Sequence, residues 1–340
     1  MIDQDGPRMP AEWAHHARTW MAWPAREDLW GDGLEEARLS YAELADAIAA
    51  YEPVTMIARP DLVAEASLYC GKGVKVLSMP HDDSWTRDTG ATFVEMQGGG
   101  LGAVCWRFDG WGGTHPGLDE DARMAGRMAA QAGAEALDSS LVLEGGGIHV
   151  DGEGTALLCE GSVLDPKRNP GVEKAAVEAE LRRLLGVTKT IWLPAWLRDD
   201  ETRGHVDNLA CFAAPGKVVA LDPATAQEGD KEGLTANLDR LRDATDAQGR
   251  RLEITTLPLP KPKERQGGRL LTRTYINFYL CNGAAVVPAF DDPADQKAFR
   301  TIAALFPDRD PIQIEANPFL EGGGGVHCVT QQQPETQAPM

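Results

Sequence analysis

The sequence predicts an α/β protein, a five-bladed α/β propeller with pseudo-symmetry, and three observations predict it. Pairs of short apolar runs, each pair joined by a tight turn, recur along the 340 residues. A helical pattern and then another short apolar run follow each pair. The repeating unit is about 55 to 70 residues long, so five units fill the chain. Such units cannot bury their faces alone, and a closed ring leaves few exposed edges, although an open α/β sheet is a competing architecture.

The paired runs have the pattern of β-hairpins. Three of them end in Asp-Pro and turn at Gly-Glu-Gly, Pro-Gly and Asn-Gly; they are residues 148–166, 205–223 and 275–293. A looser copy spans residues 88–109 and turns at Gly98–Gly100. These four segments are the predicted hairpins of units two to five.

Helices and returning strands complete each unit. Leucines and other apolar residues at helical spacing predict helices around 177–185, 234–241 and 299–306, and composition favours helices at 35–51, 61–70 and 119–132. The predicted strands are 54–58, 74–79, 190–193, 253–257 and 312–315.

The two ends of the chain are expected to meet. The first unit begins near residues 19–23, and residues 329–331 would lie beside it and close the ring. We therefore expect one catalytic domain over residues 1–334 and a flexible tail over 335–340. The basic, Pro- and Gly-rich segment 258–273 is either a solvated connection or a mobile cover over a central site.

The charge of the chain bounds its partners. Its net charge of 33 − 52 = −19 disfavours nucleic acid and anionic membranes and mildly favours cationic small molecules. No apolar run approaches the roughly 20 residues that span a bilayer, and the N-terminus lacks the pattern of a signal peptide. A cytoplasmic protein is expected.

Six scattered cysteines, with no Cys-x-x-Cys pair, argue against a disulfide framework and a structural zinc site. Cys105, Cys159, Cys211 and Cys281 lie in strand-like runs and are expected to be inert core thiols. Cys328 differs because it follows four consecutive glycines, which suit a sharp turn or a close approach. It is the candidate nucleophile.

The starts of the hairpins should meet near the axis of the ring. There the segments 83–90, 144–151 and 201–208, together with Asn277 and Cys328, would gather a thiol, histidines and carboxylates. His205 and Asp207 are two residues apart, which on a strand places both side chains on one face. A histidine beside a carboxylate has a raised pKa and suits general acid work, although a structural histidine is the alternative.

The carboxylates indicate the substrate class. Asp88, Glu144 and Asp207 accept hydrogen bonds and suit a planar guanidinium cation, whereas an acyl-transfer site needs donors. They would also raise the pKa of Cys328 until a cation arrives. A phosphate loop at Gly322–Gly325, or a metal site formed by His149, His205, Asp207 and Cys328, is a weaker reading. Trp85 is either a core residue or a wall beside the cation.

With these motifs the chain resembles the bacterial agmatine deiminase and peptidyl-arginine deiminase family of guanidine-modifying enzymes. The resemblance runs nearly end to end and rests on the segments Met9–Trp13, Trp20–Pro24, Asp83–Gly90, Glu144–Gly152, Glu201–Asn208 and Gly322–Gln332. It implies a five-bladed α/β propeller.

The resemblance also implies roles for single residues. Cys328 would attack the guanidinium carbon, and His205 would act first as acid and then as base. Asp88 and Asp207 would clamp the guanidinium, and Glu144 and Trp85 match positions in the substrate pocket. Glu201 and Arg203 are further candidates for substrate contact. The resemblance implies no metal and no organic cofactor. Two positions depart from the family pattern, Ala91 for proline and Gly325 for asparagine.

The expected reaction is the hydrolysis of agmatine to N-carbamoylputrescine and ammonia through a covalent cysteine intermediate, a step toward putrescine. A deiminase of free or peptidyl arginine is the alternative, and a non-catalytic binder of cations is a third reading. The expected partner is a small guanidino cation, and a homodimer or higher homo-oligomer is possible.

Overall fold

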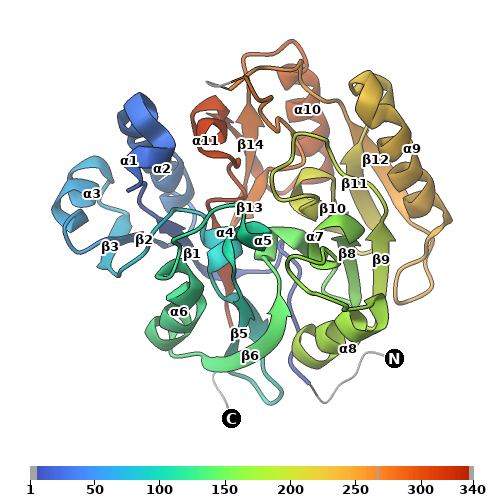
Figure 1. Cartoon of the computed structure of the whole chain (residues 1–340), viewed down its shortest axis with the longest axis horizontal. Coiled ribbons are helices and arrows are strands. Elements are labelled where there is room, and N and C mark those ends of the chain that lie inside the picture. The colour runs from blue at the N-terminus through green and yellow to red at the C-terminus, as the bar shows by residue number, and fades with distance from the viewer. Residues whose placement is uncertain (1–5, 266–267, 337–340) are drawn as a thin grey trace.

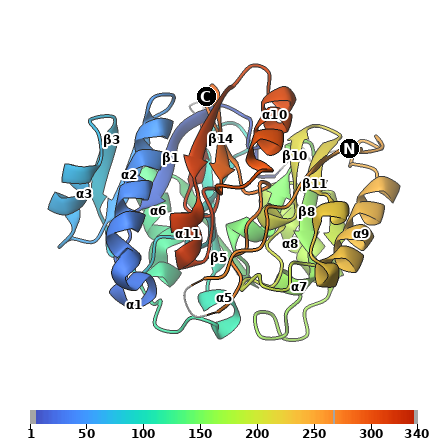
Figure 2. The same cartoon turned by 90° about the horizontal axis from the view of Figure 1, so that it is seen from above.

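Five small β-sheets stand around a common centre, with helices on the outside (Figure 1). The structure is a computed structural model that describes residues 6–265 and 268–336. Figure 2 shows α2 (Leu34–Ala49) on one side of the molecule and α9 (Glu228–Asp243) on the other. The α/β class and the ring of five units are confirmed.

Four sheets share one plan, in which two consecutive antiparallel strands form a hairpin and a third strand returns in parallel beside the second. The hairpins are β4 (Thr92–Glu95) with β5 (Leu101–Arg107), β7 (Ile148–Val150) with β8 (Thr155–Cys159), β10 (Ala210–Ala214) with β11 (Lys217–Leu221), and β13 (Tyr279–Cys281) with β14 (Ala284–Ala289). The returning strands are β6 (Glu135–Val142), β9 (Lys189–Leu193), β12 (Glu253–Leu257) and β15 (Asp310–Glu315). All four predicted hairpins are confirmed.

The fifth sheet joins the two ends of the chain. In it β1 (His16–Ala22) pairs in parallel with β2 (Val54–Ala58), and β3 (Val74–Ser78) extends the sheet. The antiparallel partner of β1 is β16 (Gln331–Pro334), with Trp20 opposite Gln331. The predicted closure of the ring is therefore confirmed. In the first blade, the antiparallel strand beside β1 is β16, which comes from the other end of the sequence.

Helices connect the strands of each blade. The longer ones are α2 (Leu34–Ala49), α3 (Val63–Tyr69), α6 (Met124–Ala132), α8 (Lys174–Leu185), α9 (Glu228–Asp243) and α10 (Asp295–Leu305). Short helices near the centre or its rim are α1 (Glu27–Trp30), α4 (Thr86–Thr89), α5 (Gly110–Gly113), α7 (Glu160–Val163) and α11 (Asn317–Gly322). The 3-10 turns are η1 (Gly31–Gly33), η2 (Asp121–Arg123), η3 (Gly145–Gly147), η4 (Val206–Asn208) and η5 (Pro223–Thr225).

The apolar spacing of the helices becomes their buried face. In α9 the buried leucines are Leu234, Leu238 and Leu241, and α8 buries Val177 together with its leucines. Each such side chain stabilises the fold by about 1.5–3 kcal/mol relative to an exposed one. Among the described residues, no helix combines the length and the apolar content that crossing a bilayer requires.

Two expectations about strands need correction. His205 and Asp207 do not lie on a strand, because residues 206–208 form the 3-10 turn η4 and β10 begins only at Ala210. The chain bends at the centre of the ring, where a strand would have no ladder partner. The sequence also did not predict β6, whose first residues are mostly polar and exposed and thus lack an apolar run.

The tail is held at its start. The backbone N–H of Glu335 donates to the carbonyl of His15 (2.8 Å), and the side chains of the two residues form an ion pair. Residues 337–340 of the predicted flexible tail lie outside the described residues.

Candidate active site

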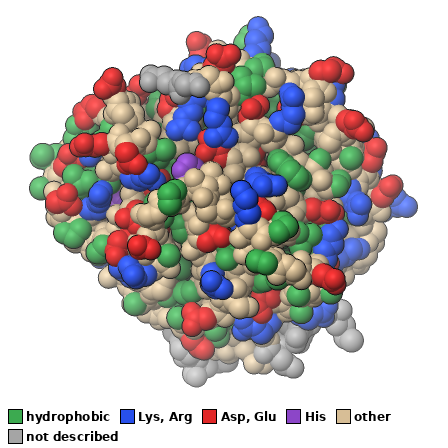
Figure 3. Space-filling model, viewed as in Figure 1, with side chains coloured by type: hydrophobic (Ala, Val, Ile, Leu, Met, Phe, Trp, Pro, Cys, Tyr) green, Lys and Arg blue, Asp and Glu red, His purple; other side chains and the backbone are tan. Residues whose placement is uncertain are grey.

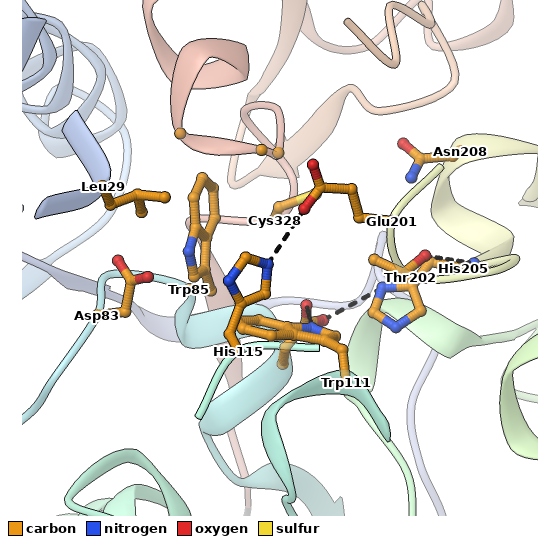
Figure 4. A pocket seen from close by; sticks show the side chains of 14 residues that line it. Leu29, Asp83, Trp85, Trp111, His115, Glu201, Thr202, His205, Asn208 and Cys328 are labelled. Atoms are coloured by element: carbon orange, nitrogen blue, oxygen red, sulfur yellow. Dashed lines mark hydrogen bonds and ion pairs between the residues drawn. The ribbon is translucent and has the colours of Figure 1, made fainter. Parts of the chain in front are cut away.

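A cavity opens at the centre of the ring, where the starts of the hairpins meet (Figure 4). Its lining consists of Leu29, Asp83, Trp85, Asp88, Trp111, His115, Glu201, Thr202, His205, Asn208, Gly322, Gly323, Gly324 and Cys328. Five of the eight predicted site residues are in this lining: Cys328, His205, Asp88, Trp85 and Glu201. Asp207 and Glu144 lie directly behind it, in contact with Cys328 and His205.

Cys328 is buried at the bottom of the cavity. Its Sγ lies 3.6 Å from Oδ2 of Asp207 and accepts a hydrogen bond from Nδ2 of Asn277 (3.2 Å). Burial, together with the charges of Asp207 and Asp88, raises the pKa of the Cys328 thiol well above its ordinary value. The sequence predicted the direction and the carboxylates, but burial is the larger cause.

Asn277 supports the nucleophile from the last blade. Besides its contact with the sulfur, its Oδ1 accepts from the backbone N–H of His327 (3.0 Å), and Nδ2 donates to Asn208 (3.2 Å). The sequence placed Asn277 at a hairpin start without a role. The side-chain amide thus holds the backbone at His327, one residue before the nucleophile, and contacts the sulfur itself.

Asp88 enters the cavity from α4. Its Oδ2 accepts from Nε1 of Trp111 (2.9 Å) and its Oδ1 from the backbone N–H of Gly146 (3.1 Å). Burial raises the pKa of Asp88 to about 6, with His205 opposing and the neighbouring carboxylates adding to the rise. Asp88 is therefore ionised at neutral pH, but its pKa lies only a little below that pH.

Trp111 was missed by the sequence analysis. It has φ +56°, a left-handed conformation that bulky residues rarely adopt, in a segment whose neighbours are glycines. This backbone aims the indole N–H at Asp88 and leaves the ring in the wall of the cavity. A glycine-rich run, Gly110-Trp111-Gly112-Gly113, is the signal that could have pointed to it.

His205 lies between two carboxylates. Its Nε2 is 3.2 Å from Oε2 of Glu144, and its Nδ1 is 3.6 Å from Oδ1 of Asp88. Burial disfavours the charged ring, but Asp88 and Glu144 outweigh it and raise the pKa of His205 to about 9. The ring is an imidazolium at neutral pH, as general acid work requires.

Glu144 holds His205 from behind. Its Oε1 accepts from Nε of the buried Arg168 (2.8 Å), and its Oε2 faces His205. Although burial opposes the charge, Arg168 and His205 lower the pKa of Glu144. Since both oxygens face protein groups, this geometry lends no support to the predicted contact of Glu144 with substrate, which stays a prediction.

Asp207 presents one free oxygen. Its Oδ2 lies 2.9 Å from Nδ1 of His327, whereas its buried Oδ1 has no hydrogen-bond partner among the described residues. Nδ1 of His205 is likewise buried without a hydrogen bond in that part of the chain. Buried polar atoms are normally paired, so unpaired ones at a cavity indicate groups that a ligand satisfies.

A glycine allows these groups to approach one another closely. A Cβ atom on Gly146 would lie 2.7 Å from Nδ1 of His205, 2.8 Å from Oδ1 of Asp88 and 3.1 Å from Oδ2 of Asp207. The three groups therefore pack so closely around Gly146 that even a methyl group would displace them. Their donors and acceptors suit a flat cation with several N–H groups.

Aromatic rings and a charged bridge form the mouth. Trp85 stacks on Trp30, with ring centroids 6.1 Å apart, and the six-membered part of its indole would lie 2.7 Å from a Cβ on Gly324. Glu201 bridges two loops, since its Oε2 is 3.1 Å from Nε2 of His115 and its Oε1 is 2.8 Å from Arg269. Arg269 belongs to the basic segment 258–273, which therefore reaches the mouth, and Figure 3 shows acidic and basic side chains interleaved on this face.

Arg203 lies apart from the cavity. Its side chain is half-exposed and its NH1 is 3.5 Å from Oδ2 of Asp165. The backbone of Arg203 has φ +63°, which turns the chain just before His205. The predicted contact of Arg203 with substrate gains no support from this position.

The assembled groups can perform one kind of chemistry well. A cysteine lies below an acceptor-lined space, an imidazolium stands at its side, and carboxylates face the same space. A cation bound there would lower the thiol pKa and place its electrophilic carbon near the sulfur. Within residues 6–265 and 268–336, no group of three or more His, Cys, Asp or Glu residues is arranged to hold a metal ion.

Comparison with known proteins identifies relatives over the whole chain. The model of the Porphyromonas-type peptidyl-arginine deiminase family matches residues 8–334. The agmatine deiminase of Stutzerimonas stutzeri is 41% identical over 355 residues, covering 97% of this chain and 96% of that protein. A Streptomyces avermitilis protein named provisionally as an agmatine deiminase is 44% identical over 340 residues and covers 97% and 98%.

Solved structures agree with the ring described above. A structure titled as the agmatine deiminase of Enterococcus faecalis catalysing its reaction has a TM-score of 0.94 at 32% identity, over 98% of this chain and 97% of that one. A substrate-bound agmatine deiminase of C. jejuni has a TM-score of 0.86 at 25% identity and covers 97% and 96%.

Proposed function

This chain belongs to the Porphyromonas-type peptidyl-arginine deiminase family, and from that premise we infer that it is an agmatine deiminase. It hydrolyses the guanidino group of agmatine to an ureido group and releases ammonia. The observation that carries the assignment of residues is the set of buried groups around Gly146, in which Oδ1 of Asp207 and Nδ1 of His205 lack hydrogen bonds within the described residues.

The first half of the reaction forms a covalent intermediate. The guanidinium lies against Asp88 and Asp207, and its charge lowers the pKa of Cys328, so that the thiol releases its proton to solvent and becomes a thiolate. The sulfur attacks the guanidinium carbon and gives a neutral tetrahedral adduct. His205 donates its proton to one nitrogen, the C–N bond breaks, ammonia leaves, and a cationic amidino group remains on the sulfur.

The second half consumes water. His205, now neutral, takes a proton from water as the oxygen adds to the amidino carbon. The second tetrahedral adduct expels the thiolate, and transfer of the proton from oxygen to this thiolate gives the ureido product and restores the thiol. Glu144 holds His205 in place through both halves, since it faces Nε2 while Nδ1 stays free for proton transfer.

The lining of the cavity favours agmatine over arginine. Besides Asp88, it contains the carboxylates of Asp83 and Glu201, and no lysine or arginine among the described residues lines it. Both histidines of the lining already face carboxylates, since His115 is hydrogen-bonded to Glu201 and His205 lies between Glu144 and Asp88. The amine of agmatine suits such acids, whereas the carboxylate of arginine would be repelled. Figure 4 shows Asp83 and Glu201 on different sides of the cavity.

Ammonia release from agmatine, arginine and an arginine-containing peptide tests the substrate directly. We expect turnover of agmatine, with kcat/KM at least about 100-fold above that for the other two, because an unpaired buried charge costs several kcal/mol. Cys328→Ala should release no ammonia from any of them, and Cys211→Ala, at a buried cysteine outside the lining, serves as the control. Faster turnover of arginine than of agmatine would overturn the assignment.

A second comparison locates the amine end. Glu201→Gln and Asp83→Asn should raise KM for agmatine about tenfold or more, as loss of a partly buried charge partner does, and change KM for butylguanidine little, since that compound lacks the amine. Equal effects on both compounds would place the amine elsewhere.

Two further expectations stay proposals. All six cysteines are unpaired, which fits a reducing compartment and so a cytoplasmic location. The second proposal is assembly as a homodimer or larger homo-oligomer. Sedimentation of the full chain in the analytical ultracentrifuge tests it.

A further inference from the structure

Behind Asp207 lies a buried row of ionisable groups that the reaction above does not use. His327, the neighbour of Cys328 in sequence, has Nδ1 2.9 Å from Oδ2 of Asp207 and Nε2 2.9 Å from Oε2 of Glu12. His149 lies on the other side of Glu12, with Nε2 3.5 Å from the same oxygen. All four residues are at most 6% exposed, so water does not screen their charges.

The two histidines come from equivalent positions of a repeated motif. His149 ends the run Glu144-Gly-Gly-Gly-Ile-His149, and His327 ends the run Glu321-Gly-Gly-Gly-Gly-Val-His327. Both turn inward and meet at Glu12, which belongs to the segment before β1. The blades thus deliver two related histidines to one carboxylate, but only His327 also reaches the active site.

The contacts of His149 fix its protonation. Its Nδ1 accepts a hydrogen bond from the backbone N–H of Phe212 (3.2 Å), so this nitrogen carries no proton. The proton must then lie on Nε2, which faces Glu12, and the ring is neutral. His149 is a donor to Glu12 without a charge of its own.

The contacts of His327 require a different state. A neutral imidazole has one N–H, so one of its two nitrogens would oppose a carboxylate with a lone pair. Both contacts are favourable only when the ring is an imidazolium or one carboxyl group is protonated. Although burial and the nearby Arg87 oppose the charge on the ring, Glu12 and Asp207 raise the pKa of His327, and His327 lowers the pKa of both carboxyl groups.

We propose that His327 is a positioning residue, an imidazolium held between Glu12 and Asp207 that keeps Asp207 ionised and leaves its Oδ1 free for the guanidinium. The inference rests on the proposed function, because it assigns Asp207 to the substrate. His327 occupies Oδ2, and the same oxygen is 3.6 Å from the sulfur of Cys328. Oδ1 is left as the buried oxygen without a partner in the described chain.

The need for such a cation follows from the local charge. Asp207 is buried beside Asp88 and the thiol of Cys328, and each of them as an anion would push Asp207 to bind a proton. A protonated Asp207 would hold the guanidinium less well. The groups that face His327 are Asp207, Glu12, Cys328 and Arg87, whose Nε donates to the backbone carbonyl of His327, and the ring of Tyr279 packs at 6.4 Å.

Two amide substitutions separate the two contacts of the ring. The amide N–H of asparagine can replace Nδ1 but does not reach as far as Nε2, whereas that of glutamine can replace Nε2. We expect His327→Asn to retain a donor for Asp207 and to lose less kcat/KM for agmatine than His327→Gln. The loss in His327→Gln should be about 100-fold or more, and KM should rise with it, because Asp207 no longer holds the guanidinium in place.

A spectroscopic measurement tests the charge without turnover. In the full-length protein labelled with nitrogen-15 histidine, His327 should show two protonated ring nitrogens at about pH 8, where a free histidine is neutral. His149 should show one protonated nitrogen, Nε2, at the same pH. Glu12→Gln should return the His327 signals to those of a neutral ring, and spectra of the His327 and His149 variants assign the signals.

The outcomes distinguish this inference from the function on which it rests. If the wild-type protein releases no ammonia from agmatine, the proposed function fails, whereas the nitrogen-15 spectra still report on His327. If the wild-type protein is active and folded His327→Gln matches it in kcat and KM, or if the His327 ring is neutral at about pH 8, the inference is wrong. His15→Gln, at an exposed histidine, is the matched control and should change neither measurement.

Discussion

At the scale of single residues, the site separates the proton affinities of its groups. Burial raises the pKa of Asp88 to about 6, and Asp88 and Glu144 outweigh burial to raise that of His205 to about 9. Between these values Asp88 is an anion and His205 a cation, which is the pair of states that the first half of the reaction needs. The fold thus holds the carboxylate of Asp88 and the imidazolium of His205 3.6 Å apart, with both groups charged.

The pH dependence of activity should reflect these two groups. We expect kcat/KM for agmatine to fall below about pH 6, where Asp88 takes up a proton, and above about pH 9, where His205 loses one. Glu144→Gln removes an interaction that raises the pKa of His205, so the alkaline limb should move to lower pH. Stopped assays of ammonia release across the pH range measure both limbs.

A surface pair provides the control for that shift. Glu180 pairs with Arg183 as Glu144 pairs with Arg168, but it lies away from the cavity. Glu180→Gln should leave both limbs in place. An alkaline limb that stays fixed in a folded Glu144→Gln variant would mean that His205 does not set it.

At the scale of the elements, short central turns carry the chemistry and the blades carry the turns. Asp88 lies in α4, Gly146 in η3 and Asp207 in η4, and each of these precedes the hairpin of its blade. The tight backbone of η3 passes between His205 and the two aspartates because Gly146 lacks a side chain. The close approach of His205 to the two aspartates therefore depends on the backbone at Gly146.

Substitution of that glycine should remove activity without unfolding the protein. In Gly146→Ala the new Cβ would approach His205 and Asp88 to less than 3 Å, so the two side chains must move apart. We expect kcat/KM to fall by about 100-fold or more, the usual cost of misplacing reacting groups by about 1 Å. Steady-state kinetics and a thermal melt of the same preparation measure the two effects separately.

The adjacent glycine gives a close control. A Cβ on Gly147 would make ordinary contacts, 3.7 Å from Oγ of Ser162 and 3.8 Å from Cδ2 of His205. Gly147→Ala should keep kcat/KM within about threefold of wild type. If the two variants lose activity equally, the close packing at Gly146 does not position the reacting groups.

The elements also show what a sequence can predict. Hairpins and helices repeat in local patterns, so four hairpins and the leucine faces of α8 and α9 were predictable. The motif residues Cys328, His205 and Asp88 were found because each sits in a recognisable run. The strand β6 was missed because its exposed polar residues interrupt the apolar run by which a strand is recognised. The 3-10 turn at 206–208 was taken for a strand.

At the scale of the whole molecule, the contacts that complete the site join residues far apart in the chain. Glu12 meets His327 across 315 positions, and Trp111 meets Asp88 through a backbone conformation that no apolar pattern reports. The contact of Glu12 with His327 joins the segment before β1 to the segment before β16, the two strands that close the ring. A local reading of the sequence therefore identified the reacting groups and missed Trp111, Glu12 and the role of Asn277, which hold them.

We expect the closing strand β16 to stabilise the folded protein through its contact with Arg87. This buried arginine donates from NH1 to Oε1 of Gln332 (2.7 Å), and its backbone N–H donates to the carbonyl of Cys328 (3.2 Å). Gln332→Leu leaves a buried charged group without that acceptor and should lower the free energy of unfolding by about 1–3 kcal/mol. Denaturant titration measures the change.

The preceding glutamine tests whether any polar loss in β16 would do the same. Gln331 is buried, and its Oε1 has no hydrogen-bond partner among the described residues. Gln331→Leu should therefore cost less than Gln332→Leu, or even stabilise the protein. The reverse order would show that Arg87 does not depend on the closing strand.

The raised pKa of Cys328 affects how readily peroxides oxidise this thiol. Peroxides attack thiolates and leave neutral thiols largely untouched, and the first product on that route is a sulfenic acid. Because burial and two carboxylates raise the pKa of the Cys328 thiol, we expect the empty enzyme to resist this damage. The reactive form exists only while a cation occupies the cavity, and then the substrate itself covers the sulfur, so the same charges that delay catalysis until the substrate arrives also preserve the enzyme between turnovers.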